Sequence, residues 1–172
     1  MNVRRVSVLA AMVVTALLLQ VSVLPVIAGG GFVPDLLVVL VVVLTLEHGA
    51  RTGLWVAAFS GLLVDLAASS VPLGTVLLVM ISIAYLVGLL RPYVTERADL
   101  TTAVLSGVFA VLAVLAQAAL TVLLSTQEPP AAGVVGWSAV IVGVFAILLA
   151  PPVLMLVRRT LTRPELAHEV GR

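Results

Sequence analysis

Hydrophobic positions along the chain fall in long, nearly uninterrupted runs that are separated by short groups of glycine, proline and charged residues. A helix needs about 20 apolar residues to cross the hydrocarbon core of a bilayer, and most of these runs approach or reach that length. Glycine, proline and charged residues are typical of the turns and loops between helices. The pattern predicts six membrane-spanning helices, over residues 6–27, 32–46, 52–68, 73–90, 101–124 and 136–157.

Composition supports the same class of protein, because 62% of the 172 residues are hydrophobic and only 10% are charged. So few charges cannot cover the surface of a soluble domain of this size, and the remaining apolar surface must face lipid. We therefore expect an all-α polytopic membrane protein, a bundle of six transmembrane helices. It would form a single transmembrane domain over residues 1–157, followed by a short basic cytoplasmic tail over residues 158–172.

The distribution of positive charge predicts the orientation. If the N-terminus is cytoplasmic, six crossings place every basic residue of the chain on the cytoplasmic side: Arg4, Arg5, Arg51, Arg91, Arg97, Arg158, Arg159, Arg163 and Arg172. Arginine near the ends of spans is retained in the cytoplasm. A five-span arrangement would put some of these arginines on the wrong side. We expect both termini to be cytoplasmic, with the first run retained as an anchor, since it is longer than a signal-peptide core of about 7–15 residues.

Several classes of chemistry are excluded. The chain has no cysteine, which excludes disulfides and thiolate chemistry. His48 and His168 are too far apart in sequence for an ordinary histidine metal site. No basic patch interleaved with aromatic residues suggests nucleic acid. No complete serine–histidine, paired-aspartate or metal set lies within the spans, so we expect no enzyme, no catalytic residue, no metal and no cofactor.

Two aspartates lie in the predicted spans. Asp35 follows Pro34 at the start of the second span, where an aspartate caps a helix favourably. Asp65 lies near the outer end of the third span, and an ionisable residue at such depth is by default a functional hypothesis. The alternative is an interfacial residue that bonds the loop around Ser69 and Ser70. Both aspartates would lie towards the outer leaflet, where they could be close together, but nothing there completes a catalytic dyad.

Small residues recur at steps of three and four on the fifth and sixth spans: Ala103, Ser106, Ala110, Ala113 and Gln117, then Gly136, Ala139, Gly143, Ala146 and Ala150. Such stripes let helices approach closely in lipid. We expect the two spans to pack on each other; the alternative is that one stripe faces a partner subunit. A third stripe, Gly53, Ala57 and Gly61, leads up to Asp65.

Two local features complete the pattern. Pro151 and Pro152 lie within the sixth span, and a double proline predicts a kink. Glu47 and Arg51 are four residues apart at a cytoplasmic turn, where a simple surface ion pair is expected.

The order of short motifs along the chain resembles the rod shape-determining MreD family. The motifs are Pro34-Asp35-Leu36-Leu37, Gly61-Leu62-Leu63-Val64-Asp65-Leu66, Pro72-Leu73-Gly74, Tyr85-Leu86-Val87-Gly88, and Ala150-Pro151-Pro152 before Arg158-Arg159. The resemblance covers nearly the whole chain and is clearest over residues 34–91. Pro34, Asp35, Asp65, Pro72 and Gly74 match recurrent positions of the family, and with Gly61 they are the candidate partner-interaction or structural residues.

This resemblance implies a non-enzymatic subunit of the bacterial cell-elongation machinery in the cytoplasmic (inner) membrane. Such proteins lie beside MreC and support the glycosyltransferase and transpeptidase pair that builds lateral peptidoglycan, in step with the actin-like MreB filament. The implied fold is similar to that of the substrate-binding S-components of energy-coupling vitamin transporters. That similarity leaves an alternative open: a small-molecule-binding subunit of an energy-coupled transporter, with an enclosed polar pocket near the outer leaflet that uses Asp35 and Asp65.

Overall fold

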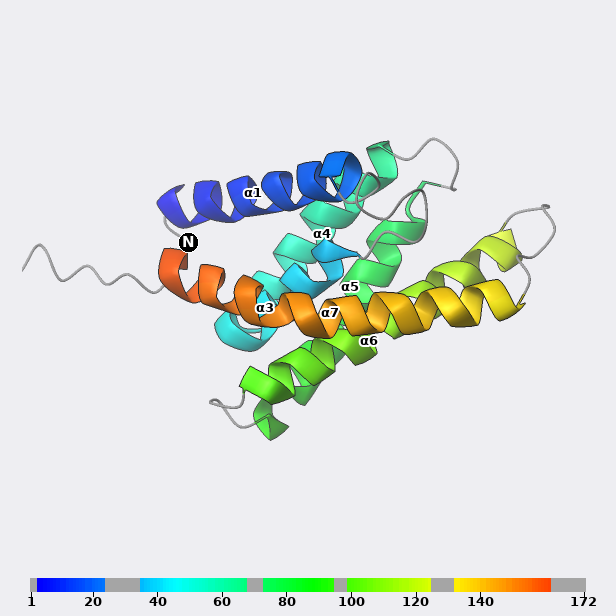
Figure 1. Ribbon diagram of the computed structural model, residues 1–172. Helices are drawn as coiled ribbons and strands as arrows, with labels where there is room; N and C mark the ends of the chain where they lie inside the picture. The colour runs from blue at the N-terminus through cyan, green and yellow to red at the C-terminus, as the bar shows by residue number, and fades with distance from the viewer. Residues whose placement is uncertain (1–2, 24–34, 68–72, 95–98, 125–131, 162–172) are drawn as a thin grey trace, which may run out of the picture.

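The computed structural model describes residues 3–23, 35–67, 73–94, 99–124 and 132–161, and the elements in these ranges are helices (Figure 1). They are α1 (Val3–Leu18) with the π-helical turn η1 (Leu19–Val23), α3 (Leu36–His48), α4 (Ala50–Ala67), α5 (Thr75–Leu90) with the 3-10 turn η2 (Arg91–Tyr93), α6 (Asp99–Leu124) and α7 (Ala132–Leu161). The expectation of an all-α bundle with six α-helices is confirmed. The described helices begin and end within a few residues of the predicted bounds, and α7 continues to Leu161. The predicted span ends at residues 27, 32 and 68 lie outside the described residues.

Within the described residues, four helices are long and apolar enough to cross a membrane: Ala50–Ala67, Thr75–Tyr93, Asp99–Leu124 and Gly133–Thr160. This finding confirms a polytopic membrane protein. Two further apolar helices, Ser7–Ser22 and Leu36–His48, are shorter. The second predicted span is thus a helix of 13 residues, which rises only about 20 Å.

Helix α3 is the centre of the bundle. It packs against each of the other α-helices that the structure describes, and every residue from Leu37 to Thr45 is buried. A helix that is apolar on all sides is stable when protein or lipid surrounds it. Because α3 is surrounded mostly by protein, its length need not match a hydrocarbon core of about 30 Å.

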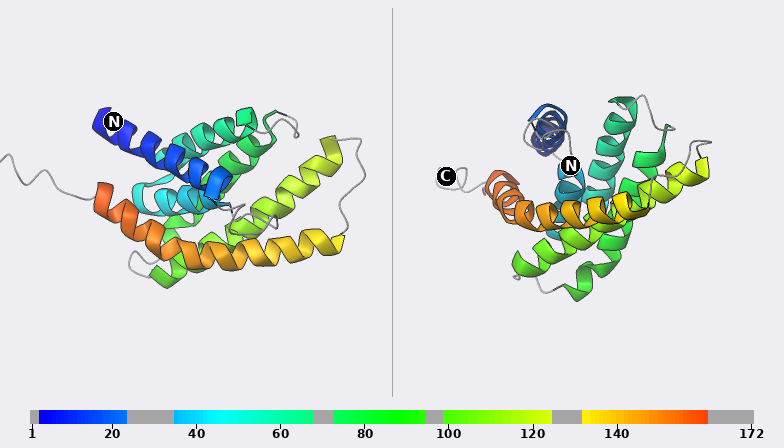
Figure 2. Two further views of the ribbon diagram at one scale, coloured as in Figure 1. Left: turned by 45° about the horizontal axis from the view of Figure 1, so that its top comes forward. Right: turned by 45° about the vertical axis from the view of Figure 1, so that its right-hand side comes forward.

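Two hairpins enclose α3, one made of α4 and α5 and the other of α6 and α7 (Figure 1). Helix α1 lies outside them and buries a single stripe, Leu9, Val13 and Ala16, at the spacing of one helix face. Figure 1 and the left view of Figure 2 place the beginning of α1 and the end of α7 at the same end of the molecule. A bond from Thr160 Oγ1 to Met12 Sδ, 3.8 Å long, joins these two helices.

The predicted packing of the fifth span on the sixth is confirmed. A Cβ atom on Gly107 of α6 would lie 2.5 Å from Cγ1 of Ile147 on α7, and one on Gly143 of α7 would lie 2.7 Å from Cγ2 of Val111. The absent side chains therefore let the two helices approach closely. Helix α7 stays helical through Pro151 and Pro152.

Glycines with positive φ mark two helix ends in the described part of the chain. Gly49, with φ 92°, separates α3 from α4 and donates its N–H to the carbonyl oxygen of Thr45 at 2.9 Å. Gly74, with φ 96°, precedes α5. Left-handed backbone of this kind favours glycine, so these positions fix where the chain reverses.

Candidate functional site

Asp65, near the end of α4, binds the beginning of α5. The residue is 3% exposed. Its Oδ2 atom accepts the N–H groups of Gly74 at 3.1 Å and Leu77 at 3.0 Å, and its Oδ1 atom accepts that of Val76 at 3.2 Å. The first N–H groups of a helix have no partner within that helix. A carboxylate from the neighbouring helix therefore caps α5, at the end where negative charge is favoured.

Gly61 explains how Asp65 comes within reach of those N–H groups. It lies one helical turn before Asp65, and a Cβ atom on Gly61 would lie 2.6 Å from Cα of Leu77. The backbones of α4 and α5 thus touch at this point. The motif residues Gly61, Asp65 and Gly74 form one structural unit, the α4–α5 junction. The loop around Ser69 and Ser70, which Asp65 was expected to bond, lies outside the described residues.

Asp35 is the N-cap of α3, as expected. Its Oδ1 atom accepts the N–H of Val38 at 3.3 Å. Gln20, from η1, supports the same turn, because its Oε1 atom accepts the N–H of Leu37 at 3.4 Å. Asp35 and Asp65 therefore cap two different helices. The other two motif residues, Pro34 and Pro72, lie outside the described residues, and whether any of the six contacts a partner stays a prediction.

The opposite end of α3 holds an ionic cluster, at what we call the charged end of the bundle. Arg158 of α7 donates to Oε1 of Glu47 from Nη2 at 2.8 Å and from Nε at 3.1 Å, and its Nη1 atom donates to Oδ1 of Asp99 at 2.9 Å. The expected pair between Glu47 and Arg51 is therefore wrong. Gly49 separates α3 from α4, so residues 47 and 51 do not lie on one continuous helix.

Arg91 holds the same end of α3 by a different contact. Its Nε atom donates to the backbone carbonyl of Leu46 at 2.9 Å, which satisfies an oxygen that a helix C-terminus leaves without a partner. Sequence reasoning missed both contacts, because the partners are 45 and 111 residues apart. The available signal was that these charged residues stand at helix ends predicted for the same side.

These polar groups hold helices together. Within the described ranges, no buried side-chain nitrogen or oxygen lacks a hydrogen-bond partner, and no group of three or more histidine, cysteine, aspartate or glutamate residues could hold a metal ion. Asp65 accepts several backbone N–H bonds, and Glu47 and Asp99 pair with Arg158, so these carboxylates stabilise the fold. Chemically, this arrangement caps helices and fixes their relative positions.

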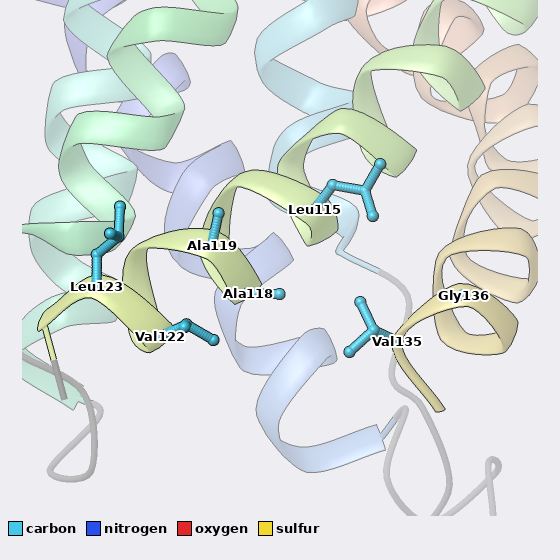
Figure 3. A pocket seen from close by; sticks show the side chains of 7 residues that line it. All are labelled: Leu115, Ala118, Ala119, Val122, Leu123, Val135 and Gly136. Carbon is cyan, nitrogen blue, oxygen red and sulfur yellow. The ribbon is translucent and has the colours of Figure 1, made fainter. Parts of the chain in front are cut away.

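The end of α6 and the beginning of α7 spread apart (Figure 2, left). An open apolar groove of about 580 Å³ lies between them. Figure 3 shows its lining side chains, which come from these two helices alone: Leu115, Ala118, Ala119, Val122, Leu123, Val135 and Gly136. Small residues from both helices form the floor of the groove. Leu123 lies at its rim, where its side chain is 78% exposed. We call this feature the α6–α7 groove; it lies far from the charged end.

Comparison with known proteins identifies the family of the chain. No curated protein and no solved structure matches the chain, so the expected similarity to transporter S-components stays a prediction. The model of one family, the rod shape-determining protein MreD, matches residues 2–160. That match covers nearly the whole chain and every described residue except Leu161. The chain therefore belongs to the MreD family of rod shape-determining membrane proteins.

Proposed function

We propose that this chain is a non-enzymatic scaffold of the bacterial cell-elongation complex, which binds MreC and supports the glycosyltransferase and transpeptidase pair that extends lateral peptidoglycan. Contact with the MreB filament is indirect. Family membership supports the rod-shape role. The observation that carries the scaffold mechanism is the α6–α7 groove, an open apolar surface within the membrane-spanning part of the chain.

The occupant that we assign to the groove is a transmembrane helix of MreC. Association of helices in lipid depends on close packing, which small residues permit. Ala118, Ala119 and Gly136 offer such a floor, and the leucine and valine side chains around them offer walls. Because α6 and α7 contact each other closely at Gly107 and Gly143 but spread beyond, a third helix can pack between their ends without displacing either.

The proposed topology has a single six-helix transmembrane domain over residues 1–157, a basic tail over residues 158–172, and both termini in the cytoplasm of the inner membrane. The charged end supports this arrangement, because the ends of α3 and α7 and the beginning of α6 meet there through Arg158. Helices that run alternately up and down bring these ends to one side. The arginine-rich side would be cytoplasmic.

The chain has no cysteine, so crosslinking from single introduced cysteines tests the partner assignment directly. Ala119→Cys in the groove, labelled with a photoreactive benzophenone thiol reagent that inserts into C–H bonds, should crosslink to MreC in native membranes on irradiation. Ala11→Cys, on the exposed face of α1, is the matched control and should crosslink several-fold less. Equal yields at the two positions would remove the groove from the proposal.

A packing variant separates the scaffold from the transporter alternative. Ala119→Phe should fill the groove, reduce MreC recovery and round the cells, whereas Ala11→Phe should do neither. The transporter alternative needs free polar groups in an enclosed pocket, yet Asp35 and Asp65 are occupied with helix N–H groups. Co-purification with an ATPase module, with cell shape unchanged on depletion, would support the transporter alternative instead.

A further inference from the structure

A second hollow, of about 270 Å³, lies on the exposed surface of α4 and α5 near the charged end of the bundle. It is lined by Arg51, Leu54, Trp55, Ala58 and Ile81. Arg51 stands at the start of α4, and Trp55 is 64% exposed beside it. We call this feature the Arg51 hollow; none of its residues belongs to the motifs or to the α6–α7 groove.

The hollow has one polar end and one apolar end. From Arg51 to Ala58 the helix advances about 10 Å, which is the distance from the headgroup region into the acyl chains. Arginine at a span end, with tryptophan next to it, is typical of the membrane interface. Leu54, Ala58 and Ile81 then continue the hollow along the helices as an apolar channel open to the side.

The charge of Arg51 is positive, and no ion pair within the described ranges involves it. The two ion pairs that the described residues form both belong to Arg158, which engages Glu47 and Asp99. Arg91 adds a second guanidinium at the turn before α4, since a Cβ atom on Gly49 would lie 3.3 Å from its Nη1 atom. A guanidinium binds phosphate in a bidentate manner. Among the residues that the structure describes, no carboxylate lines the hollow to bind the ammonium group of a zwitterionic lipid.

We propose that the Arg51 hollow binds an anionic phospholipid, with the phosphate on Arg51 and one acyl chain along Leu54, Ala58 and Ile81. The site needs only that α4 and α5 span a membrane, so it stands apart from the assignment of MreC to the α6–α7 groove. A basic residue near an anionic membrane surface contributes a local enrichment of about fivefold. The shape of the hollow directs that enrichment to one place beside Trp55.

The two tryptophans of the chain make the proposal measurable, because Trp55 lies near the charged end and Trp137 lies near the opposite end of α7. The full chain with Trp137→Phe is reconstituted in phosphatidylcholine vesicles. An equal small fraction of the lipid is then replaced by dibrominated phosphatidylglycerol or by dibrominated phosphatidylcholine. Bromine quenches fluorescence on contact, so preferential quenching of Trp55 by the anionic lipid is the expected result.

Matched variants decide whether the preference belongs to this hollow. Arg51→Gln should make the two brominated lipids quench Trp55 equally, whereas Arg159→Gln, which removes the same charge elsewhere at the charged end, should keep the preference. Ala58→Phe, which fills the hollow and keeps Arg51, should also reduce it. The chain with Trp55→Phe reports on Trp137 and should show no preference.

Three outcomes would overturn the proposal. The first is equal quenching of Trp55 by the two lipids in the protein with Trp137→Phe. The second is an undiminished preference after Arg51→Gln. The third is an equal loss after Arg51→Gln and Arg159→Gln, which would show a general effect of surface charge. If Arg51→Gln does not fold, loss of preference in Ala58→Phe decides the question in its place.

Discussion

Removing the carboxylate of Asp65 should destabilise the bundle much more than removing that of Asp35. Both cap helices, but Asp65 accepts three N–H bonds at the α4–α5 junction, whereas Asp35 accepts the N–H of Val38. Replacing a capping residue by alanine costs about 0.5–2 kcal/mol, and a hydrogen bond to a charged group contributes about 1.5–3 kcal/mol. Because such bonds are not additive, we expect Asp65→Ala to cost about 3–4 kcal/mol, and Asp35→Ala about 1 kcal/mol.

The measurement is the free energy of unfolding of the purified chain in mixed micelles, from titration with a denaturing detergent and detection by circular dichroism. Asp65→Asn is the informative intermediate. Its amide oxygen can take the place of Oδ2 and accept from Gly74 and Leu77, which leaves its NH₂ group facing the N–H of Val76. We expect about half the loss seen for Asp65→Ala. Equal losses for Asp65→Ala and Asp35→Ala would refute the reasoning that the extra bonds stabilise the junction.

A separate readout asks whether Asp65 also serves a partner. If it does, membranes that contain Asp65→Asn should hold inserted protein at the normal level yet give reduced recovery of MreC. Wild-type recovery would leave Asp65 with the structural role alone.

Three further results are expected. Gly61→Ala should destabilise the chain by about 1–3 kcal/mol, because its Cβ meets the backbone of α5, whereas Gly133→Ala, which meets nothing within 4 Å, should be neutral or stabilising in the same titration. Arg158→Gln should lower the free energy of unfolding by about 0.5–1 kcal/mol, as loss of partly exposed ion pairs does, and Arg159→Gln should lower it less. The reverse order would show that the ionic cluster does not stabilise the bundle. Truncation after Val157 should disturb orientation more than folding, measured by labelling of cysteines added at either terminus, and an unchanged topology would show that the earlier arginines suffice.

The sequence predicts the helices well because each depends on its own residues. Runs of apolar side chains locate them, and glycine at positions 49 and 74 ends or begins them by backbone geometry that is local. The stripe on the sixth span includes Gly143, which lies in the α6–α7 interface, whereas the glycine of α6 in close contact, Gly107, was not part of the predicted stripe. Capping by Asp35 follows from its place in the sequence, immediately before the first residue of α3.

Contacts between distant residues are where sequence reasoning failed. Glu47 has an arginine four residues away, but its partner is Arg158, because a break at Gly49 turns Arg51 away from the helix that carries Glu47. The hydrophobic pattern of α3 also does not show that the other helices pack around it on all sides. Its length and composition alone suit a short span, and only the packing shows why a 13-residue helix is sufficient.

The motif residues and the α6–α7 groove have different roles, and the packing explains why. Asp35, Gly61, Asp65 and Gly74 cap or join α3, α4 and α5, and such roles demand one residue type at one position, which makes them visible as motifs. The α6–α7 groove needs only small side chains below and large ones around, and many apolar sequences satisfy that demand. If the groove binds MreC as proposed, recognition depends on shape: exchanging its side chains in volume-conserving pairs should preserve MreC recovery, whereas a single enlargement at Ala119 should reduce it.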